Sequence, residues 1–360
     1  MCKTFIIAEA GVNHNGSIQL GKELIEGAAK AGADAIKFQT FVTDYILTDK
    51  AAKADYQIKS TDPAESQIEM VKKLELSPKM HEELIGHCKK NNIQFLSTPF
   101  DEPSVDLLVN TFNIPILKIA SGEITNAPLL LKMARMGKPI ILSTGVSTIA
   151  DVEKALGVLA FGYQVPQRHT PSIEAFEQAF CSEEGQKLLQ TNVTLLHCTS
   201  EYPAPFSEVN LNVMDTLRQT FSLPVGYSDH TKGIAVPIAA VAKGAVVIEK
   251  HITLDCNLPG PDHKASLELE EFTEMVSAIR QVEASLGQSL KIPSFSEVKN
   301  KSVIRKSIVT SRKVNKGETF TADNLTIKRP GDGLSPFYYW DYIGRTANKT
   351  HQKNEQVSFE

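Results

Sequence analysis

The sequence predicts an α/β fold, a (β/α)₈ TIM barrel followed by a small β-rich domain. Short apolar segments recur through the first 287 residues, and segments with helical periodicity separate them. Consecutive apolar positions are typical of parallel strands that are buried on both faces. The pattern then breaks into the polar, proline-containing segment 288–299, after which β-prone runs alternate with turn sequences. We therefore expect a barrel over 1–287, a linker over 288–299 and a small domain over 300–360.

Eight apolar segments are the candidate strands. They lie at residues 5–10, 35–40, 93–98, 116–121, 139–144, 193–199, 224–229 and 245–251. The intervening segments, such as "LGKELIEGAAKAGA" and "MHEELIGHCKKNN", place apolar residues three and four positions apart and end near Gly or Asn. Eight strand–helix units favour a closed barrel. An open doubly wound sheet stays an alternative, although "GVNHNG" after the first strand does not match G-x-G-x-x-G.

Composition excludes several other classes of protein. The chain has 360 residues, 42% of them hydrophobic and 22% charged, and its formal net charge is −4, too small to indicate nucleic-acid or membrane-surface binding. The five cysteines include no C-x-x-C pair, which fits free thiols in a reducing compartment. The sequence shows no signal-peptide core and no apolar run long enough to span a membrane. We expect a cytoplasmic protein without nucleic-acid or membrane partners.

Polar residues stand at the C-terminal ends of the candidate strands, where (β/α)₈ barrels carry their chemistry. One Ser or Thr at a strand end often only meets water, but two lysines, three glutamates and two histidines at one rim indicate a site. The residues at these ends are Glu9, Lys37, Gln39, Thr98, Lys118, Ser121, Glu123, Ser143, Thr199, Ser200, Ser228, His230, Glu249 and His251. Lys118 and Ser121 are three positions apart, so on a regular strand their side chains would point to opposite faces. The chain must therefore leave the strand near Ala120 for both to face inward.

His230 and His251 end two consecutive strands, which would be neighbours about 5 Å apart. Two imidazoles at one level can share a divalent metal ion, with water or substrate oxygens completing its coordination. Such an open site suits an oxygen-preferring ion such as Mn²⁺ or Mg²⁺. A histidine at a strand end can instead form only a hydrogen bond in the core, and the residues alone leave both interpretations open.

A cationic, hydroxyl-rich lining is expected from Lys37, Lys118, Ser121, Ser143 and Ser228. Ammonium groups and directed hydroxyl donors together are suited to binding a phosphate group. One of the lysines could instead form a Schiff base, as in a barrel aldolase. Two lysines beside several serines favour anion binding over the dry pocket that a Schiff-base lysine requires.

At these residues the sequence resembles the sialic acid synthase family, and the resemblance covers the whole chain. It rests on a series of motifs in family order: "IIAEAGVNHNG", "AIKFQTF", "FLSTPFD", "KIASGEITN", "ILSTG", "LLHCTSEYPAPF", "GYSDHT", "EKHITLD" and "GPDHKAS". The tail after Lys299, including "KRPGDGLSP", resembles the family's SAF (antifreeze-like) domain. The resemblance implies a metal-dependent enzyme that condenses phosphoenolpyruvate with an open-chain 2-acetamido sugar and water, and releases phosphate by C–O cleavage.

The resemblance also implies roles for individual residues. Metal ligands would be His230 and His251, with Mn²⁺ favoured and Mg²⁺ or Co²⁺ as alternatives. Phosphoenolpyruvate contacts would be Lys37, Thr98, Lys118, Ser121, Ser143 and Ser228. Sugar contacts would be Gln39, Tyr202, Asp262 and Arg329, and the active-site acids would be Glu123, as the catalytic glutamate, and Glu9. Ser200 stands where some members carry Asn, which puts a phosphoenolpyruvate contact there in doubt.

The family further implies a homodimer, in which the SAF domain of one chain caps the partner's barrel and offers Arg329 to the acetamido group of the sugar.

Several motifs are closer to N,N′-diacetyllegionaminate synthases, which use 2,4-diacetamido-2,4,6-trideoxymannose, than to N-acetylneuraminate synthases, which use N-acetylmannosamine. The neuraminate enzymes stay the alternative. A Schiff-base aldolase and a non-catalytic sugar- or ice-binding protein are more remote, and the complete set of rim residues argues against the second.

Overall fold

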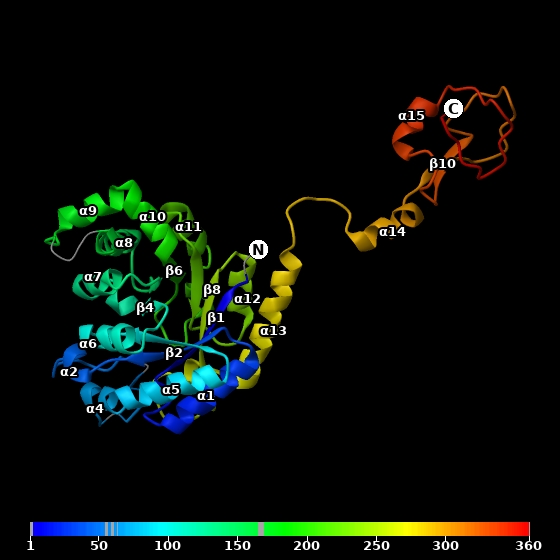
Figure 1. Cartoon of the computed structure of the whole chain (residues 1–360). Coiled ribbons are helices and arrows are strands. Elements are labelled where there is room, and N and C mark those ends of the chain that lie inside the picture. Colours follow the sequence, from blue (N-terminus) through cyan, green and yellow to red (C-terminus); the bar gives the residue numbers. More distant parts are fainter. Residues whose placement is uncertain (1–2, 55–56, 59–60, 63, 165–168, 360) are drawn as a thin grey trace. The chain divides into compact units, whose positions relative to one another are not determined.

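The computed structural model describes residues 3–54, 57–58, 61–62, 64–164 and 169–359. The chain divides into two compact units, Met1–Gly287 and Gln288–Glu360 (Figure 1). Among the described residues, no helix is both long enough and apolar enough to cross a membrane.

The described part of the first unit contains eight parallel strands that form a near-barrel, which confirms the predicted fold. The strands are β1 (Phe5–Gly11), β2 (Ala35–Thr40), β3 (Gln94–Pro99), β4 (Leu117–Ile119), β5 (Ile140–Ser143), β6 (Val193–His197), β7 (Val225–Asp229) and β8 (Val247–Thr253). They lie in the order β3-β2-β1-β8-β7-β6-β5-β4, and the two end strands contact each other. A two-residue strand, β9 (Leu267–Glu268), pairs with β8.

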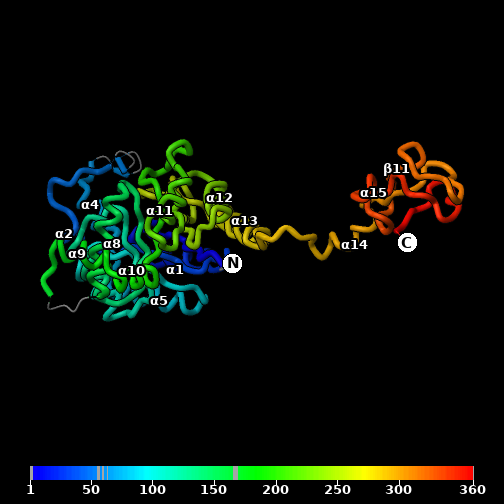
Figure 2. The backbone as a smooth tube through the Cα atoms, turned by 90° about the horizontal axis from the view of Figure 1, so that it is seen from above, coloured from blue at the N-terminus to red at the C-terminus, as the bar shows by residue number. Residues whose placement is uncertain are grey.

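Helices surround these strands on the outside (Figures 1 and 2). Those that follow successive strands include α1 (Ile18–Ala31), α5 (Pro78–Lys90), α6 (Glu102–Asp106) with the π-helical turn η1 (Leu107–Thr111), α7 (Ala127–Arg135), α8 (Ile149–Gln164), α11 (Val213–Phe221), α12 (Ala235–Ala242) and α13 (Leu269–Leu286). Local sequence signals set their ends. Ser17 caps α1 by accepting a hydrogen bond from the backbone N–H of Leu20, and Gly32 ends the same helix in the left-handed conformation.

Additional elements lie between these units. Helices α2 (Thr43–Ile46) and α4 (Gln67–Lys72) separate β2 from α5, and helices α9 (Ile173–Cys181) and α10 (Glu183–Asn192) separate α8 from β6. Three 3₁₀ turns follow strands: η2 (Ser121–Glu123), η3 (Phe206–Glu208) and η4 (His263–Ala265). Strand β4 ends at Ile119 and η2 begins at Ser121, so the chain leaves the strand at Ala120, as the parity of the neighbouring residues requires.

Side chains inside the barrel form two layers of different character. The first is apolar and consists of Ile7, Ala35, Leu96, Ile141, Leu196 and Val247, which pack as one cluster. Because side chains alternate between the two faces of a strand, residues two positions further on point into the same interior. Those residues are Glu9, Lys37, Thr98, Ser143, Cys198 and Glu249. The interior therefore changes from an apolar plug to a polar site within one step along each strand.

The second unit is built around an antiparallel strand pair. Its elements are α14 (Phe295–Ile304), β10 (Ser307–Thr310), β11 (Leu325–Lys328), the 3₁₀ turn η5 (Pro336–Tyr338) and α15 (Tyr339–Tyr342). Its core consists of Ile308, Val314, Phe320, Leu325, Tyr342, Ala347 and Val357. Helix α14 begins inside the segment 288–299 that the sequence predicts to be a linker.

Candidate active site

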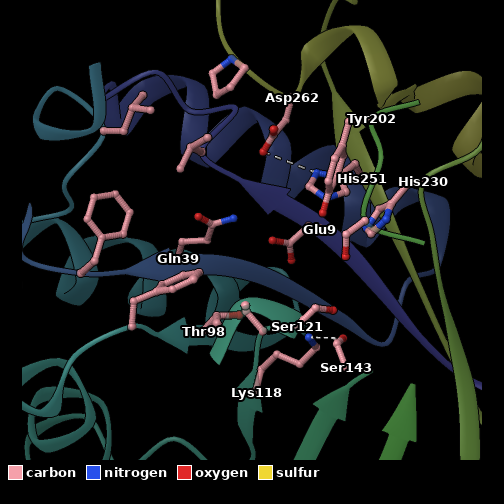
Figure 3. A pocket seen from close by; sticks show the side chains of 18 of the residues that line it. Glu9, Gln39, Thr98, Lys118, Ser121, Ser143, Tyr202, His230, His251 and Asp262 are labelled. Carbon is pink, nitrogen blue, oxygen red and sulfur yellow. Dashed lines mark hydrogen bonds and ion pairs between the residues drawn. The ribbon is translucent and has the colours of Figure 1, made fainter. Parts of the chain in front are cut away.

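A cavity of about 420 Å³ opens at the C-terminal ends of the barrel strands (Figure 3). It brings together nearly all the barrel residues that the sequence singles out: Glu9, Lys37, Gln39, Thr98, Lys118, Ser121, Ser143, Ser200, Tyr202, Ser228, His230, Glu249, His251 and Asp262. Glu123 and Thr199 are the exceptions. Glu123 is the last residue of η2, two positions after Ser121, and its carboxylate accepts a 2.7 Å hydrogen bond from Asn126.

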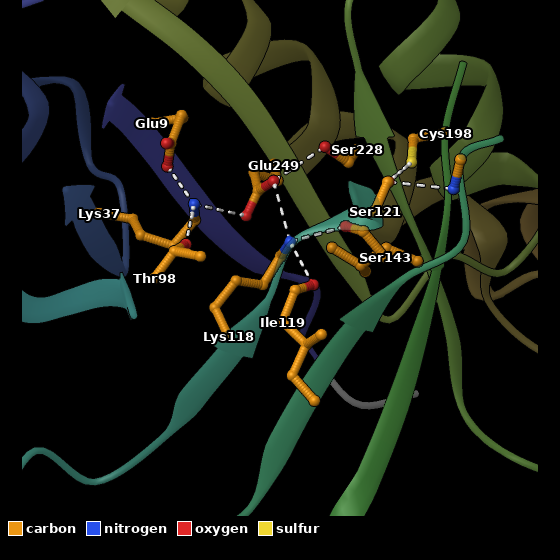
Figure 4. A network of polar contacts seen from close by, with 12 residues as sticks. Glu9, Lys37, Thr98, Lys118, Ile119, Ser121, Ser143, Cys198, Ser228 and Glu249 are labelled. Atoms are coloured by element: carbon orange, nitrogen blue, oxygen red, sulfur yellow. Dashed lines mark hydrogen bonds and ion pairs between the residues drawn. The ribbon is translucent and has the colours of Figure 1, made fainter. Parts of the chain in front are cut away.

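Two lysines and two glutamates form a buried ion network at the bottom of this cavity (Figure 4). The Lys37 ammonium lies 2.5 Å from the Glu9 carboxylate and 3.4 Å from the carboxylate of Glu249, and Lys118 lies 3.8 Å from Glu249. Hydroxyl groups complete the network: Thr98 accepts from Lys37 at 3.0 Å, Ser143 accepts from Lys118 at 2.6 Å, and Ser228 donates to Glu249 at 2.8 Å.

The two carboxylates of the network have opposite pKa shifts. Burial raises the pKa of Glu9 to about 7, although Lys37 opposes the shift. Burial also acts to raise the pKa of Glu249, but Lys118 and Lys37 outweigh it and hold this pKa at about 2. When Glu9 is protonated, the two lysines outnumber the one ionised carboxylate, Glu249, and the bottom of the cavity is net positive. Such a site is suited to an anion.

His230 and His251 lie side by side, with ring centroids 5.6 Å apart. The Nδ1–H of His230 donates to the backbone carbonyl of Thr199 at 2.6 Å, so its Nε2 carries the free lone pair when the ring is neutral. Within the described chain, Nδ1 of His251 makes no hydrogen bond, and its nearest acidic atom is an Asp262 carboxylate oxygen 3.9 Å away. Burial lowers the pKa of both histidines, so both rings are neutral at pH 7.

These two imidazoles fit a divalent metal ion by their chemistry. Both are neutral, the Nε2 of His230 is free to act as a ligand, and His251 has a buried nitrogen without a hydrogen-bond partner in the described structure. The same described residues contain no group of three or more His, Cys, Asp or Glu side chains that could hold a metal ion. A metal at this place would therefore depend on water or substrate for its remaining ligands.

Of the residues predicted to contact a sugar, Gln39, Tyr202 and Asp262 line the same cavity as the ion network. The Tyr202 ring packs against His230 with centroids 4.2 Å apart and meets His251 edge-on at 5.7 Å (Figure 3). Burial raises the pKa of Asp262 to about 6, with Lys37 opposing the shift. Arg329 belongs to the second unit, where its Nε donates to the carbonyl of Ile304 at 3.0 Å and the residue is exposed.

Two family models match this chain. The model of the NeuB family covers residues 24–291, and that of the SAF domain covers residues 305–360. The chain belongs to the NeuB family. This confirms the resemblance to sialic acid synthases that the motifs indicate.

Similar NeuB-family proteins cover nearly the whole chain. It is 51% identical over 357 residues to the N,N′-diacetyllegionaminic acid synthase of Campylobacter jejuni, covering 99% of each sequence. Its identity to the Legionella pneumophila protein of the same name is 43% over 340 residues, covering 94% of this chain and 89% of the other. The N-acetylneuraminic acid synthetase structure from Leptospira borgpetersenii superposes with a TM-score of 0.67 at 33% identity, covering 83% and 90% of the two chains.

Some cavity residues of this NeuB-family enzyme are missed by a strand-end search. Cys198 lines the cavity and lies 3.2 Å from the hydroxyl of Ser121. Its position, two residues after the apolar Leu196 on the inner face of β6, is a signal that could have found it. Further missed residues lie in α2, in α4 and in the segments that adjoin or connect them: Ile46, Leu47, Gln57, Gln67, Met70, Val71 and Leu74.

Proposed function

We propose that this chain condenses phosphoenolpyruvate with an open-chain 2-acetamido sugar to give a nonulosonic acid, with release of phosphate by C–O cleavage. One observation carries the proposal. A single cavity holds a buried cluster of two lysines with several hydroxyl groups, next to a pair of neutral histidines. The lysine and hydroxyl cluster suits a phosphorylated acid, and the histidine pair suits a metal ion beside a carbonyl group.

The proposed sugar is 2,4-diacetamido-2,4,6-trideoxymannose, and the product N,N′-diacetyllegionaminate. The 51% identity to a N,N′-diacetyllegionaminic acid synthase supports this choice. By comparison, the chain is 35% identical over 355 residues to the N-acetylneuraminate-9-phosphate synthase of mouse. N-Acetylneuraminate synthesis from N-acetylmannosamine is the alternative.

Phosphoenolpyruvate binding is assigned to the bottom of the cavity. Lys37 and Lys118 supply positive charge, and the hydroxyl groups beside them supply directed hydrogen bonds. Thr98, Ser121, Ser143 and Ser228 are the proposed hydroxyl contacts. Glu249 keeps both lysines in place, because it lies within 4 Å of each ammonium group. It is therefore proposed to orient the lysines and to hold the Ser228 hydroxyl.

His230 and His251 would hold a divalent metal, for which Mn²⁺ is proposed ahead of Mg²⁺ or Co²⁺. When bound, such an ion supplies Lewis-acid polarisation of a carbonyl group. The bond changes are balanced without a redox partner. C3 of phosphoenolpyruvate bonds to the aldehyde carbon as the C2–C3 and carbonyl π bonds open, a water oxygen bonds to C2, and the C2–O bond to phosphate breaks. Of the two protons that water loses as C2 becomes a keto group, one ends on the former aldehyde oxygen and the other leaves with phosphate. A protein base must accept a proton from the attacking water.

Two carboxylates are proposed for proton handling. Glu9 has a pKa of about 7, so its Oε atoms can hold or release a proton at neutral pH beside Lys37. Glu123 is proposed as the catalytic glutamate that positions or deprotonates water, and it would have to turn from Asn126 toward the cavity to do so. Gln39, Tyr202 and Asp262 are the proposed sugar contacts within the barrel.

We also propose a homodimer in which the SAF domain of each chain caps the barrel of its partner and offers Arg329 to the 2-acetamido group. Arg329 is exposed within its own unit, and a guanidinium group can donate to an amide carbonyl.

The test of this function is phosphate release from phosphoenolpyruvate and the diacetamido sugar in the presence of Mn²⁺. His230→Ala and His251→Ala should each lower the rate by at least about 100-fold, because each removes a proposed metal ligand. His87→Ala is the matched control, because His87 contacts Glu26 on the outer helices and should leave the rate unchanged. A near-normal rate in either site variant would refute the shared metal site. Full activity in chelator with a borohydride-trapped lysine adduct would favour the Schiff-base aldolase.

A further inference from the structure

The cavity has a second half that differs from the ion network. Its wall is apolar and consists of Phe41, Ile46, Leu47, Met70, Val71 and Leu74, which we call the apolar wall. These residues come from helices α2 and α4 and the turns that adjoin them. The inner face of β2 leads to this wall, because Lys37, Gln39 and Phe41 follow one another at intervals of two residues. The cavity thus changes from charged to apolar as it opens.

The apolar wall is a packed part of the fold. Val12, Phe41 and Leu74 form a buried cluster, and Ile46, Val71 and Phe100 pack against it. Backbone groups at its base are held by side chains: the N–H of Val42 donates to Asp101 at 2.8 Å, and the N–H of Thr43 donates to Glu75 at 2.8 Å. These contacts fix the position of α2.

Gln67 interrupts the apolar wall with one amide group. It is the first residue of α4, whose start is fixed by a reciprocal capping box between Ser66 and Glu69. Gln67 lines the cavity, and its side-chain oxygen is buried without a hydrogen-bond partner in the described structure. Leaving a buried polar atom unpaired is unfavourable, so such an atom beside a cavity indicates a partner on a ligand.

The cavity has a polar half beside the histidines and an apolar half at the apolar wall. Their chemistry indicates which end of a bound sugar lies in each half. The aldehyde belongs beside His230 and His251, where the proposed function places the carbonyl group. Figure 3 shows Gln39 across the cavity from His230, and Phe41 of the apolar wall follows Gln39 by two residues. A sugar that extends from the histidines past Gln39 brings its far carbons to the apolar wall and to Gln67.

We propose that Gln67 and the apolar wall bind the C4–C6 end of the sugar and determine which sugar is used. The amide of Gln67 pairs with the polar atoms of a 4-acetamido group, and the apolar wall holds the acetamido methyl and the C6 methyl. N-Acetylmannosamine would instead place its C6 hydroxyl against apolar side chains, where the hydroxyl loses water without gaining a partner. This inference rests on the proposed function and adds the residues that select the substrate.

The experiment measures kcat/KM with saturating phosphoenolpyruvate and Mn²⁺ for both sugars. The preference is defined as the value for the diacetamido sugar divided by the value for N-acetylmannosamine. Gln67→Met, which keeps the side-chain length but removes the amide, should lower the preference by about 10- to 100-fold. Met70→Gln, which places a polar group in the apolar wall, should also lower it. Gln19→Met is the matched control and should not change it, because Gln19 is exposed on α1 and contacts Glu23.

Binding of phosphoenolpyruvate alone, measured by calorimetry, confirms that each variant is folded with an intact ion network. If Gln67→Met and Met70→Gln bind phosphoenolpyruvate normally but leave the preference unchanged, the inference is wrong. If wild-type protein makes a condensation product from neither sugar, the proposed function itself fails. The two failures are therefore distinguishable.

Discussion

Lys250 and Asp229 form an ion pair that is fully buried, and neither residue lines the cavity. The Lys250 ammonium lies 2.6 Å from one Asp229 oxygen, and the other oxygen accepts from the Tyr227 hydroxyl at 3.1 Å and the backbone N–H of Thr231 at 3.0 Å. The two residues are direct partners in the pairing of β7 with β8. Each precedes a proposed metal ligand, so the pair holds the register that places His230 beside His251.

Breaking this pair should destabilise the protein strongly. Lys250→Met leaves a buried carboxylate without its counter-charge and should lower the free energy of unfolding by about 3–5 kcal/mol. The double variant Asp229→Asn/Lys250→Met should lose less than Lys250→Met alone, because the unpaired charge is gone. Unfolding in urea, followed by circular dichroism, measures both.

Lys22→Met is the control for loss of an ordinary ion pair. Lys22 pairs with Glu83 on the more exposed outer helices, and removing it should cost no more than about 1 kcal/mol. Two results would contradict this account. One is a double variant that is less stable than Lys250→Met. The other is a loss of unfolding free energy in Lys250→Met that is as small as the loss in Lys22→Met.

At the scale of elements, the polar rim and its strands were predictable because both follow from local pattern. Apolar runs mark strands that are buried on both faces, and the period of two along a strand marks which residues share the interior. Lys37, Gln39, Glu249 and His251 were found in this way. The rule fails for side chains on connecting segments, because packing against distant parts of the chain decides where they point.

Helices α4 and α14 show what local signals can and cannot give. Both begin with a Ser-x-x-Glu capping box, Ser66 with Glu69 and Ser294 with Glu297. This signal could have indicated that a helix begins inside the predicted linker 288–299. It could not have indicated that Gln67 lines the cavity, because that depends on how α4 packs beside α2.

The loops that follow the neighbouring strands β1 and β8 are tied together by hydrogen bonds. Asn13, in "GVNHNG", donates to the carbonyl of Ile252 at 2.9 Å and to the hydroxyl of Ser266 at 2.8 Å. Asn15 donates to the carbonyl of Pro259 at 2.9 Å. These bonds hold the segment that follows β8, which carries Asp262. In the sequence, "GVNHNG" argues against a dinucleotide site and forms part of a family motif, and the structure shows in addition that this turn positions a candidate sugar contact.

At the scale of the whole molecule, the proposed exchange of SAF domains can be tested by mixing inactive chains. Arg329→Ala and Glu123→Gln homodimers should each be nearly inactive. In a heterodimer, the intact barrel of the Arg329→Ala chain would receive Arg329 from its partner. One of the two active sites of that dimer would therefore be complete and active. Random assembly makes half the dimers heterodimers, and we expect roughly a quarter of wild-type activity.

The control is a chain that carries both substitutions, mixed with the Glu123→Gln chain. No dimer in that mixture has an intact barrel, so no activity should return. Verified heterodimers of the two single variants that show no recovery would refute the contribution of Arg329 in trans.

The central claim is that the cavity joins phosphoenolpyruvate to a diacetamido sugar by C–O cleavage. The most direct measurement uses phosphoenolpyruvate with ¹⁸O at the bridging oxygen, together with Mn²⁺ and 2,4-diacetamido-2,4,6-trideoxymannose, followed by mass spectrometry of both products. The account predicts N,N′-diacetyllegionaminate without the label and inorganic phosphate that carries it. Label retained in the organic acid, or no condensed acid from this sugar, would contradict the account.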